Sequence, residues 1–203
     1  MGPLDPPTQS DCDALANLPS LTRLQLHFLK LTGPAHIDFV RSLPLLQQLH
    51  LRFPSAEMLP LWPRIGEALA HCAHLRELSL SNPLLTTEQL HECLAQMPLL
   101  ADLSLDSWRC SLPIRSLSFL RAGRLSLSLE ALSLRADGEE WQLRLPFSEL
   151  LHVESLQALR ICRLQGVLAS PFTAEQELVF DEHCERDTWP LLEHFHIENM
   201  TIE

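Results

Sequence analysis

The chain contains the stretch Leu100-Ala101-Asp102-Leu103-Ser104-Leu105, and its Leu-x-x-Leu-x-Leu frame recurs along most of the sequence. Two looser copies are Leu156-Leu159-Ile161 and Leu192-Phe195-Ile197, and the full frame also begins at Leu21, Leu46, Leu75 and Leu129. Successive starts lie 25, 29, 25, 29, 27 and 36 residues apart. Self-similarity at such a period indicates a protein built from stacked repeat units.

The frame alone is weak evidence, because leucine makes up 46 of the 203 residues and an accidental copy occurs at Leu26-Leu29-Leu31. The spacing is better evidence, since a second feature shares its phase. A proline stands two residues before the first frame leucine at Pro19, Pro44, Pro98 and Pro190. Proline at that point ends a preceding helix and favours extended backbone ahead of a strand.

These repeats resemble the leucine-rich repeat family, and in particular its longer-unit branch, which includes ribonuclease inhibitor and the repeat domains of F-box proteins. The resemblance covers residues 19–202. It implies an α/β leucine-rich repeat solenoid, with about seven short parallel strands on a concave face and helices or irregular returns on a convex face. The family places an asparagine or cysteine three residues after the last strand leucine. This chain has neither there, so we expect irregular winding.

Composition favours one ordered domain, since 46% of the 203 residues are hydrophobic. The net charge of −11 argues against nucleic acid as a ligand, because phosphate binding needs a basic footprint. The chain opens with neither the basic nor the apolar segment of a secretory signal, and no apolar stretch reaches the ~18 residues of a membrane span. Six cysteines without such a signal favour reduced thiols, so we predict a cytoplasmic or nuclear protein that binds no membrane.

Residues 1–10 are rich in proline and predict a disordered lead-in to a single leucine-rich repeat domain over 11–203. A short helix is expected over 11–18, capped within Ser10-Asp11-Cys12-Asp13. Helical returns are expected over 34–43, 63–72, 86–97 and 113–123, and a capping box of Thr86 and Gln89 opens the third. Residues 135–145 fit either a local hairpin or an ordinary return, and 165–188 fit an insertion that is acidic and partly helical.

The frame predicts which side chains occupy the concave face, because alternate residues of a strand point to opposite sides of the sheet. With the leucines inside, the exposed residues of the first four strands are Arg23, Gln25, His27, Gln48, His50, Arg52, Glu77, Ser79, Ser81, Asp102, Ser104 and Asp106. Those of the last three strands are Ala131, Ser133, Arg135, Ala158, Arg160, Cys162, His194, His196 and Glu198.

The charge of this predicted face changes sign twice. The first two strands are cationic or polar, the third and fourth are acidic, and the fifth and sixth are cationic again. Ser79, Ser104 and Ser133 share one strand position and form a low floor in the middle. Such a striped surface suits a protein partner with matching charges, which set specificity and encounter rate. The alternative is that a solvated sheet face is polar without any partner.

No catalytic motif occurs in the sequence: there is no P-loop, Gly-x-Gly-x-x-Gly, nucleophile elbow or His-Glu-x-x-His. His194 and His196 are the best-placed metal-ligand pair, because residues two apart on a strand face the same way, but no cluster has the paired spacing of a structural zinc site. Cys162 beside Arg160 offers a reactive thiol, against the alternative of a buried cysteine. We therefore predict no cofactor, no metal and no enzymatic activity.

Three hypotheses of function remain. The first is a non-enzymatic protein–protein interaction module that binds a partner of unknown identity on the concave face. The second rests on the resemblance to F-box proteins alone and is the substrate-recognition domain of a ubiquitin ligase. The third is a metal- or thiol-dependent enzyme that uses His194, His196 or Cys162. No closing helix follows the last strand frame, so self-association or further repeats are expected to cover that end.

Overall fold

The computed structural model describes residues 8–27, 35–52, 62–81, 86–106, 117–122, 125–135, 156–165, 191 and 193–198. Short helices and short strands alternate over most of this length. In chain order they are α1 (Gln9–Ala16), β1 (Arg23–His27), α2 (Ala35–Asp38), the 3-10 helix η1 (Phe39–Ser42), β2 (Gln48–Arg52), α3 (Trp62–Ala70), β3 (Glu77–Ser81), α4 (Thr87–Leu94), β4 (Asp102–Asp106), the 3-10 helix η3 (Ser118–Arg121), α5 (Leu125–Ser128), β5 (Ala131–Arg135), β6 (Ile161–Gln165) and β7 (His194–Glu198).

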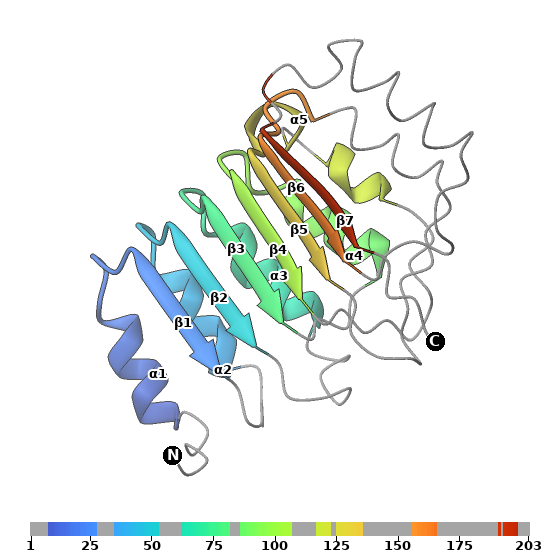
Figure 1. Cartoon of the computed structure of the whole chain (residues 1–203). Helices are drawn as coiled ribbons and strands as arrows, with labels where there is room; N and C mark the ends of the chain where they lie inside the picture. The colour runs from blue at the N-terminus through green and yellow to red at the C-terminus, as the bar shows by residue number, and fades with distance from the viewer. Residues whose placement is uncertain are drawn as a thin grey trace, which may run out of the picture.

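The strands lie side by side in one sheet, as Figure 1 shows. The sheet follows the chain in the order β1-β2-β3-β4-β5-β6-β7, and each neighbouring pair is parallel. Parallel neighbours require the chain to return to the same end of the sheet before each new strand. The expected α/β class and parallel pairing are confirmed.

The frame leucines form two ladders that run across the sheet on one of its faces. Cα partners join Leu24, Leu49, Leu78, Leu103 and Leu132 in the first ladder, and Leu26, Leu51, Leu80, Leu105 and Leu134 in the second. All are buried except Leu26, which is partly buried. No polar side chain is buried among the described residues, so this core is held by apolar burial.

A repeated backbone hydrogen-bond pair joins each unit to the next, just before the strands begin. The Thr22 carbonyl accepts from the backbone N–H groups of Gln47 and Gln48, at 2.8 and 3.0 Å. The same double acceptance, always between 2.7 and 3.0 Å, recurs at the carbonyls of Gln47, Arg76, Ala101, Glu130 and Arg160. This repetition fixes the phase of every unit independently of its side chains.

A tight turn precedes most strands and explains the spaced prolines. The N–H of the first frame residue donates to the carbonyl three residues earlier at Leu21, Leu46, Leu75, Leu100 and Leu159. Pro19, Pro44 and Pro98 are the second residues of such turns, the position that the fixed φ of proline suits best. Proline therefore acts here mainly as a turn residue directly ahead of the strand.

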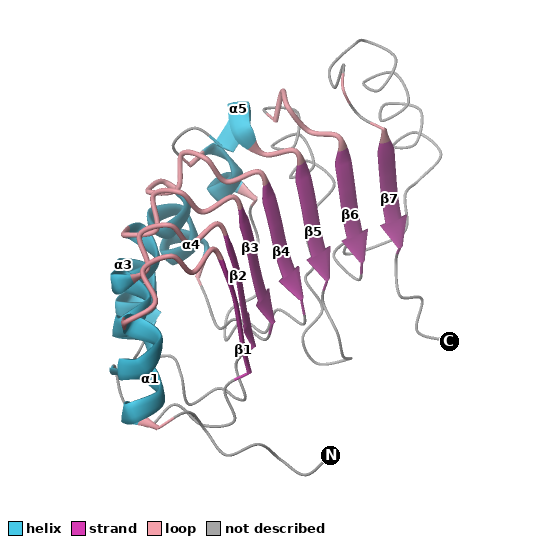
Figure 2. Ribbon diagram, turned by 90° about the vertical axis from the view of Figure 1, so that its left-hand side faces the viewer, coloured by secondary structure: helices cyan, strands magenta, loops and turns pink. Residues whose placement is uncertain are grey.

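Helices α1, α3 and α4 lie on one side of the sheet, as Figure 2 shows. Each packs on its neighbours: α1 on α2 and η1, α2 on α3, α3 on α4, and α4 on η3. In α4, Thr86 and Gln89 form the expected capping box, with both hydrogen bonds present. The return predicted over 63–72 is α3, whereas the one over 34–43 divides into α2 and η1. Within the described part of 113–123 the structure has only the 3-10 helix η3, and α5 follows it as a helix that was not predicted.

Helix α1 begins at Gln9, two residues before the predicted start. The predicted cap within 10–13 is wrong, since Thr8 is the N-cap and Asp11 closes a capping box with it. The backbone N–H of Thr8 donates to Oδ2 of Asp11 at 2.7 Å, and this hydrogen bond lowers the pKa of the Asp11 carboxyl. Threonine followed three residues later by an acid was the available sequence signal.

The predicted frame of the sixth strand is also wrong. The Leu156-Leu159-Ile161 frame faced Ala158, Arg160 and Cys162 outward, whereas β6 pairs Ile161 with Ala131 and Cys162 with Leu132. The frame that the structure uses is Leu159-Cys162-Leu164, all three buried. The last two spacings are therefore 30 and 33 residues instead of 27 and 36.

The error has a physical cause. Cysteine fills a core position that leucine fills in β1–β5, so the true sixth frame lacks its middle leucine. Leu156 opens the turn before β6, a position held elsewhere by other apolar residues such as Leu43, Cys72 and Met97. Because Leu156 lies three residues before Leu159, and Ile161 two residues after it, these three residues imitate the repeat frame although they do not occupy its positions. The hairpin or return over 135–145, apart from Arg135, and the insertion over 165–188, apart from Gln165, lie outside the described residues.

Candidate functional site

The face of the sheet opposite the leucine ladders, here called the open face, carries the residues between the frame leucines. They form three rows across the strands. The amino-end row is Arg23, Gln48, Glu77, Asp102, Ala131, Ile161 and His194. The central row is Gln25, His50, Ser79, Ser104, Ser133, Arg163 and His196, and the carboxyl-end row is His27, Arg52, Ser81, Asp106, Arg135, Gln165 and Glu198.

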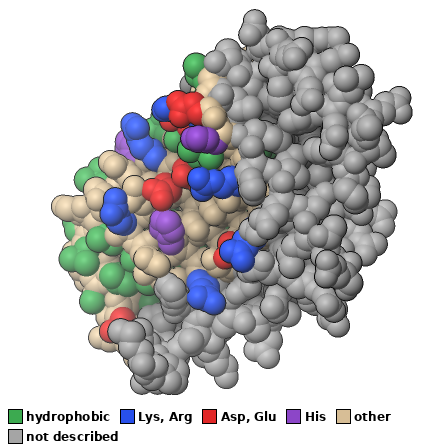
Figure 3. All heavy atoms as spheres, viewed as in Figure 1, with side chains coloured by type: hydrophobic (Ala, Val, Ile, Leu, Met, Phe, Trp, Pro, Cys, Tyr) green, Lys and Arg blue, Asp and Glu red, His purple; other side chains and the backbone are tan. Residues whose placement is uncertain are grey.

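The register places all but three of the residues predicted for the concave face on this face. The exceptions are Ala158, Arg160 and Cys162, and Arg160 was among the predicted binding residues. Figure 3 shows basic, acidic and histidine side chains gathered over the open face. For His27 and His196 the register gives a row, and nothing further is described of their side chains. Three side chains of the central row are serines on adjacent strands, Ser79, Ser104 and Ser133, so the predicted low floor is present.

Two carboxylates stand side by side in the amino-end row, because Glu77 and Asp102 are Cα partners on β3 and β4. Oε1 of Glu77 is 3.2 Å from Nε2 of His50. Among the described residues, Asp102 has no cation within 4 Å. Burial raises the pKa of the Asp102 carboxyl and the neighbouring charge of Glu77 adds to it, while His50 and Arg163 oppose the shift.

The carboxyl-end row carries a second link between the charge stripes. Nε of Arg135 on β5 lies 3.7 Å from Oδ1 of Asp106 on β4. Both side chains are about half exposed, and ion pairs of this kind contribute about 0–1 kcal/mol. This ion pair therefore joins the acidic and basic stripes across β4 and β5 at little gain in stability.

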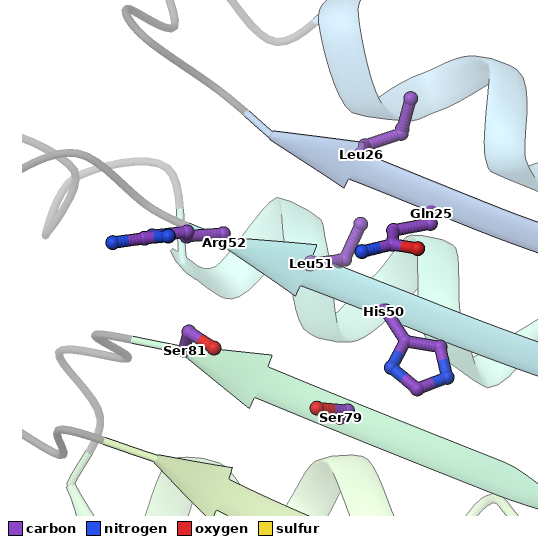
Figure 4. Close-up of a pocket in the computed structure, with 7 residues that line it drawn as sticks. All are labelled: Gln25, Leu26, His50, Leu51, Arg52, Ser79 and Ser81. Atoms are coloured by element: carbon purple, nitrogen blue, oxygen red, sulfur yellow. The ribbon is translucent and has the colours of Figure 1, made fainter.

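A shallow hollow crosses the first three strands of the open face. Its lining residues are Gln25, Leu26, His50, Leu51, Arg52, Ser79 and Ser81. Figure 4 shows that they come from β1, β2 and β3, with His50 and Ser79 standing on adjacent strands. Ser79 and Ser81 lower the surface on the β3 side, Gln25 lies on the β1 side, and Arg52 lies at the carboxyl end of β2, so the hollow can receive a polar side chain.

Arg160 does not belong to the open face, in contrast to the prediction. It lies one residue before β6, where its carbonyl joins the repeated hydrogen-bond series. Its guanidinium donates through Nε, at 3.0 Å, and through Nη2 to Oε1 of Glu193. Arg160 and Glu193 hold the same position in consecutive units, so this ion pair links the start of β6 to the start of β7.

The reactive thiol proposed at Cys162 is contradicted. Cys162 is fully buried between Leu132 and the β7 position of Phe195, and burial raises the pKa of its thiol to about 12. Burial likewise raises the pKa of Cys72 to about 11 and that of Cys93 to about 12. A thiol with such a pKa is protonated at neutral pH and is a poor nucleophile.

Three open-face residues escaped the prediction, Ile161, Arg163 and Gln165. Ile161 brings a partly exposed apolar side chain into the amino-end row, and Arg163 replaces Arg160 as the cation of β6. The sequence did contain a signal for this register. Other units also have an apolar residue three places before the first frame leucine, where it begins the turn, so Leu156 could have been assigned to the turn and Leu159 to the frame.

The described residues show neither a metal site nor a membrane span. No three His, Cys, Asp or Glu side chains within the described ranges lie close enough together to hold a metal ion. In the same ranges no helix is long and apolar enough to cross a bilayer.

Comparisons with known proteins find only distant likenesses. No protein-family model matches the chain, and no curated protein matches it significantly. One similar solved structure is the C-terminal domain of tropomodulin from Caenorhabditis elegans, with a TM-score of 0.47 and 18% identity over 87% of this chain and 93% of that one. Another is a Bacteroides fragilis protein, with a TM-score of 0.47 and 20% identity over 79% of this chain and 46% of that one.

Proposed function

We propose that the chain is an irregular leucine-rich repeat solenoid that binds a protein partner on the open face of its sheet and catalyses no reaction. The observation that carries this proposal is the contrast between the two sides of one sheet. One side packs apolar ladders against the helices, and the other presents charged side chains from β1–β6 with no described element covering them. Stripes of alternating charge on a surface select partners with complementary charges and increase the rate at which those partners associate with it.

Protein is a better ligand for this face than nucleic acid. Glu77, Asp102 and Asp106 occupy the middle of the face and would repel phosphates. The serine floor beside them is low enough for a partner's backbone or side chains to approach the strands. The partner is thus expected to span the basic and acidic stripes together.

Site-specific photo-crosslinking tests the proposal. A photoreactive amino acid replaces Ser104 on the open face or, as the matched control, Glu92, which is exposed on α4. In cell extract we expect adducts from position 104 only, and their loss when Glu77, Asp102 and Asp106 are all changed to arginine while circular dichroism shows that the fold is retained. Equal adducts from position 92, or persistence in the triple variant, would contradict the proposal.

A further inference from the structure

The amino-end row changes its chemistry halfway across the sheet. On β3 and β4 it presents the two carboxylates of Glu77 and Asp102, and on β5 and β6 it presents the partly exposed apolar side chains of Ala131 and Ile161. The neighbouring central row is polar throughout. This apolar step depends on the register found for β6, which turns Ile161 outward and Cys162 inward.

Both carboxylates are partly exposed, so an incoming cation can reach them. The residues two places further along the same strands are Ser79 and Ser104, whose short side chains take up little of the space beside the carboxylates. Nε2 of His50 lies 3.2 Å from Oε1 of Glu77. Asp102 has no cation within 4 Å among the described residues, so a guanidinium or ammonium group placed between the two carboxylates would neutralise like charges that now face each other.

We propose that the amino-end row docks a protein segment that places one arginine or lysine side chain over Glu77 and Asp102 and one large apolar side chain on Ala131 and Ile161. The inference rests on the proposed function, since it names the partner chemistry of the same face. The two half-sites lie two strands apart, and strands are spaced by about 4.8 Å, so their centres are separated by roughly 10 Å.

That separation specifies the spacing within the partner. A segment that crosses the strands in extended form advances about 3.3 Å per residue and turns alternate side chains to the same side, so the cation and the apolar side chain are two or four residues apart, which spans about 6.6 or 13 Å. A helix advances about 1.5 Å per residue, so they are about seven residues apart. Both arrangements predict the same pair of anchors in the same order along the row.

Selection of peptides on the intact chain tests this inference. A library of random twelve-residue peptides displayed on phage is selected on immobilised chain and on a blank surface. We expect enriched peptides to pair arginine or lysine with a large apolar residue two or four residues away in an extended segment, or about seven residues away in a helix. In a direct binding assay, a Glu77→Gln and Asp102→Asn double variant is expected to weaken them at least about tenfold, and Ile161→Ser to do the same.

Matched variants separate failure of the inference from failure of the proposed function. Glu67→Gln, an exposed carboxylate on α3, is the control expected to leave binding unchanged. If the variants of the amino-end row leave peptide affinity unchanged but Arg52→Gln or Arg163→Gln abolishes binding, the inference is overturned, while the open face remains the binding surface. If no open-face variant changes the affinity of the enriched peptides, both the inference and the proposed function are overturned. A selection that enriches no peptide above the blank surface would overturn the inference alone, because the crosslinking experiment tests the face independently.

Discussion

The two faces of strands β2–β5 follow different rules. On the core face every one of the eight frame positions within these strands is leucine, and each is at most 1% exposed. On the open face the amino-end row changes at every one of these strands, from Gln48 on β2 to Ala131 on β5, while the central row has histidine on β2 and serine on β3–β5. The repeated core face holds the fold together, whereas the open face is free to vary because its side chains are not part of that core.

The sharpest test of that contrast uses two adjacent residues of β4 that point to opposite faces. Leu103→Ala removes a fully buried side chain from the middle of a ladder and is expected to destabilise the chain by about 2–5 kcal/mol. Ser104→Ala, on the open face, is expected to change stability by less than about 0.5 kcal/mol. Urea unfolding followed by circular dichroism measures both, and similar losses would contradict the assignment of faces.

A second pair tests the register of β6, where sequence and structure disagree. Cys162→Ser places a hydroxyl between apolar ladders and is expected to cost about 1–3 kcal/mol. Arg163→Gln, on the open face, should leave stability within about 0.5 kcal/mol. The same unfolding measurement applies. If Arg163→Gln lost more stability than Cys162→Ser, Cys162 would face outward, and the frame predicted from the sequence, Leu156-Leu159-Ile161, would be right.

These residues show how far the sequence could predict the fold. Where leucine fills every frame position, in β1–β5, both the strands and the outward residues could be predicted. In β6 the core accepts cysteine because only burial is required there, so a pattern that counts leucines misses the strand by three residues. Backbone hydrogen bonds between neighbouring units determine where each strand begins, and these bonds cannot be predicted from the pattern of side chains.

The open face was less predictable than the strands for a related reason. Its rows are made by residues 25–33 positions apart, so one frame error moved the cation from Arg163 to Arg160 and hid Ile161. The weak ion pairs of the face, such as His50 with Glu77, depend on diagonal neighbours across strands and follow only once the register is known.

The return segments contribute to stability on a smaller scale than the ladders. Thr86→Ala removes the hydroxyl that accepts from the backbone N–H of Gln89 in the α4 capping box, and such caps contribute about 1 kcal/mol. Thr87→Ala, one residue later inside the helix, is the matched control and should have a smaller effect. Thermal unfolding compares the two, and equal midpoints would mean that the cap is not formed in solution.

The smallest expected effect has the opposite sign and concerns the open face. The pKa of Asp102 is raised in the folded chain, chiefly by burial, so its charged carboxylate opposes folding at neutral pH. A group with a raised folded pKa lends stability below its unfolded pKa, and that stability is lost as the pH rises through the folded value. We therefore expect Asp102→Asn to stabilise the chain slightly at pH 7 and to lose this advantage below about pH 4.

Asp106→Asn is the matched control, because it removes the partner of Arg135 and should give no such gain. Urea unfolding at pH 7 and pH 3.5 separates the outcomes. If Asp102→Asn is stabilising only at neutral pH, the open face carries a carboxylate that the fold does not need, as a surface kept for recognition would. A destabilised Asn variant would instead make Asp102 a structural residue and would remove it from the proposed docking site.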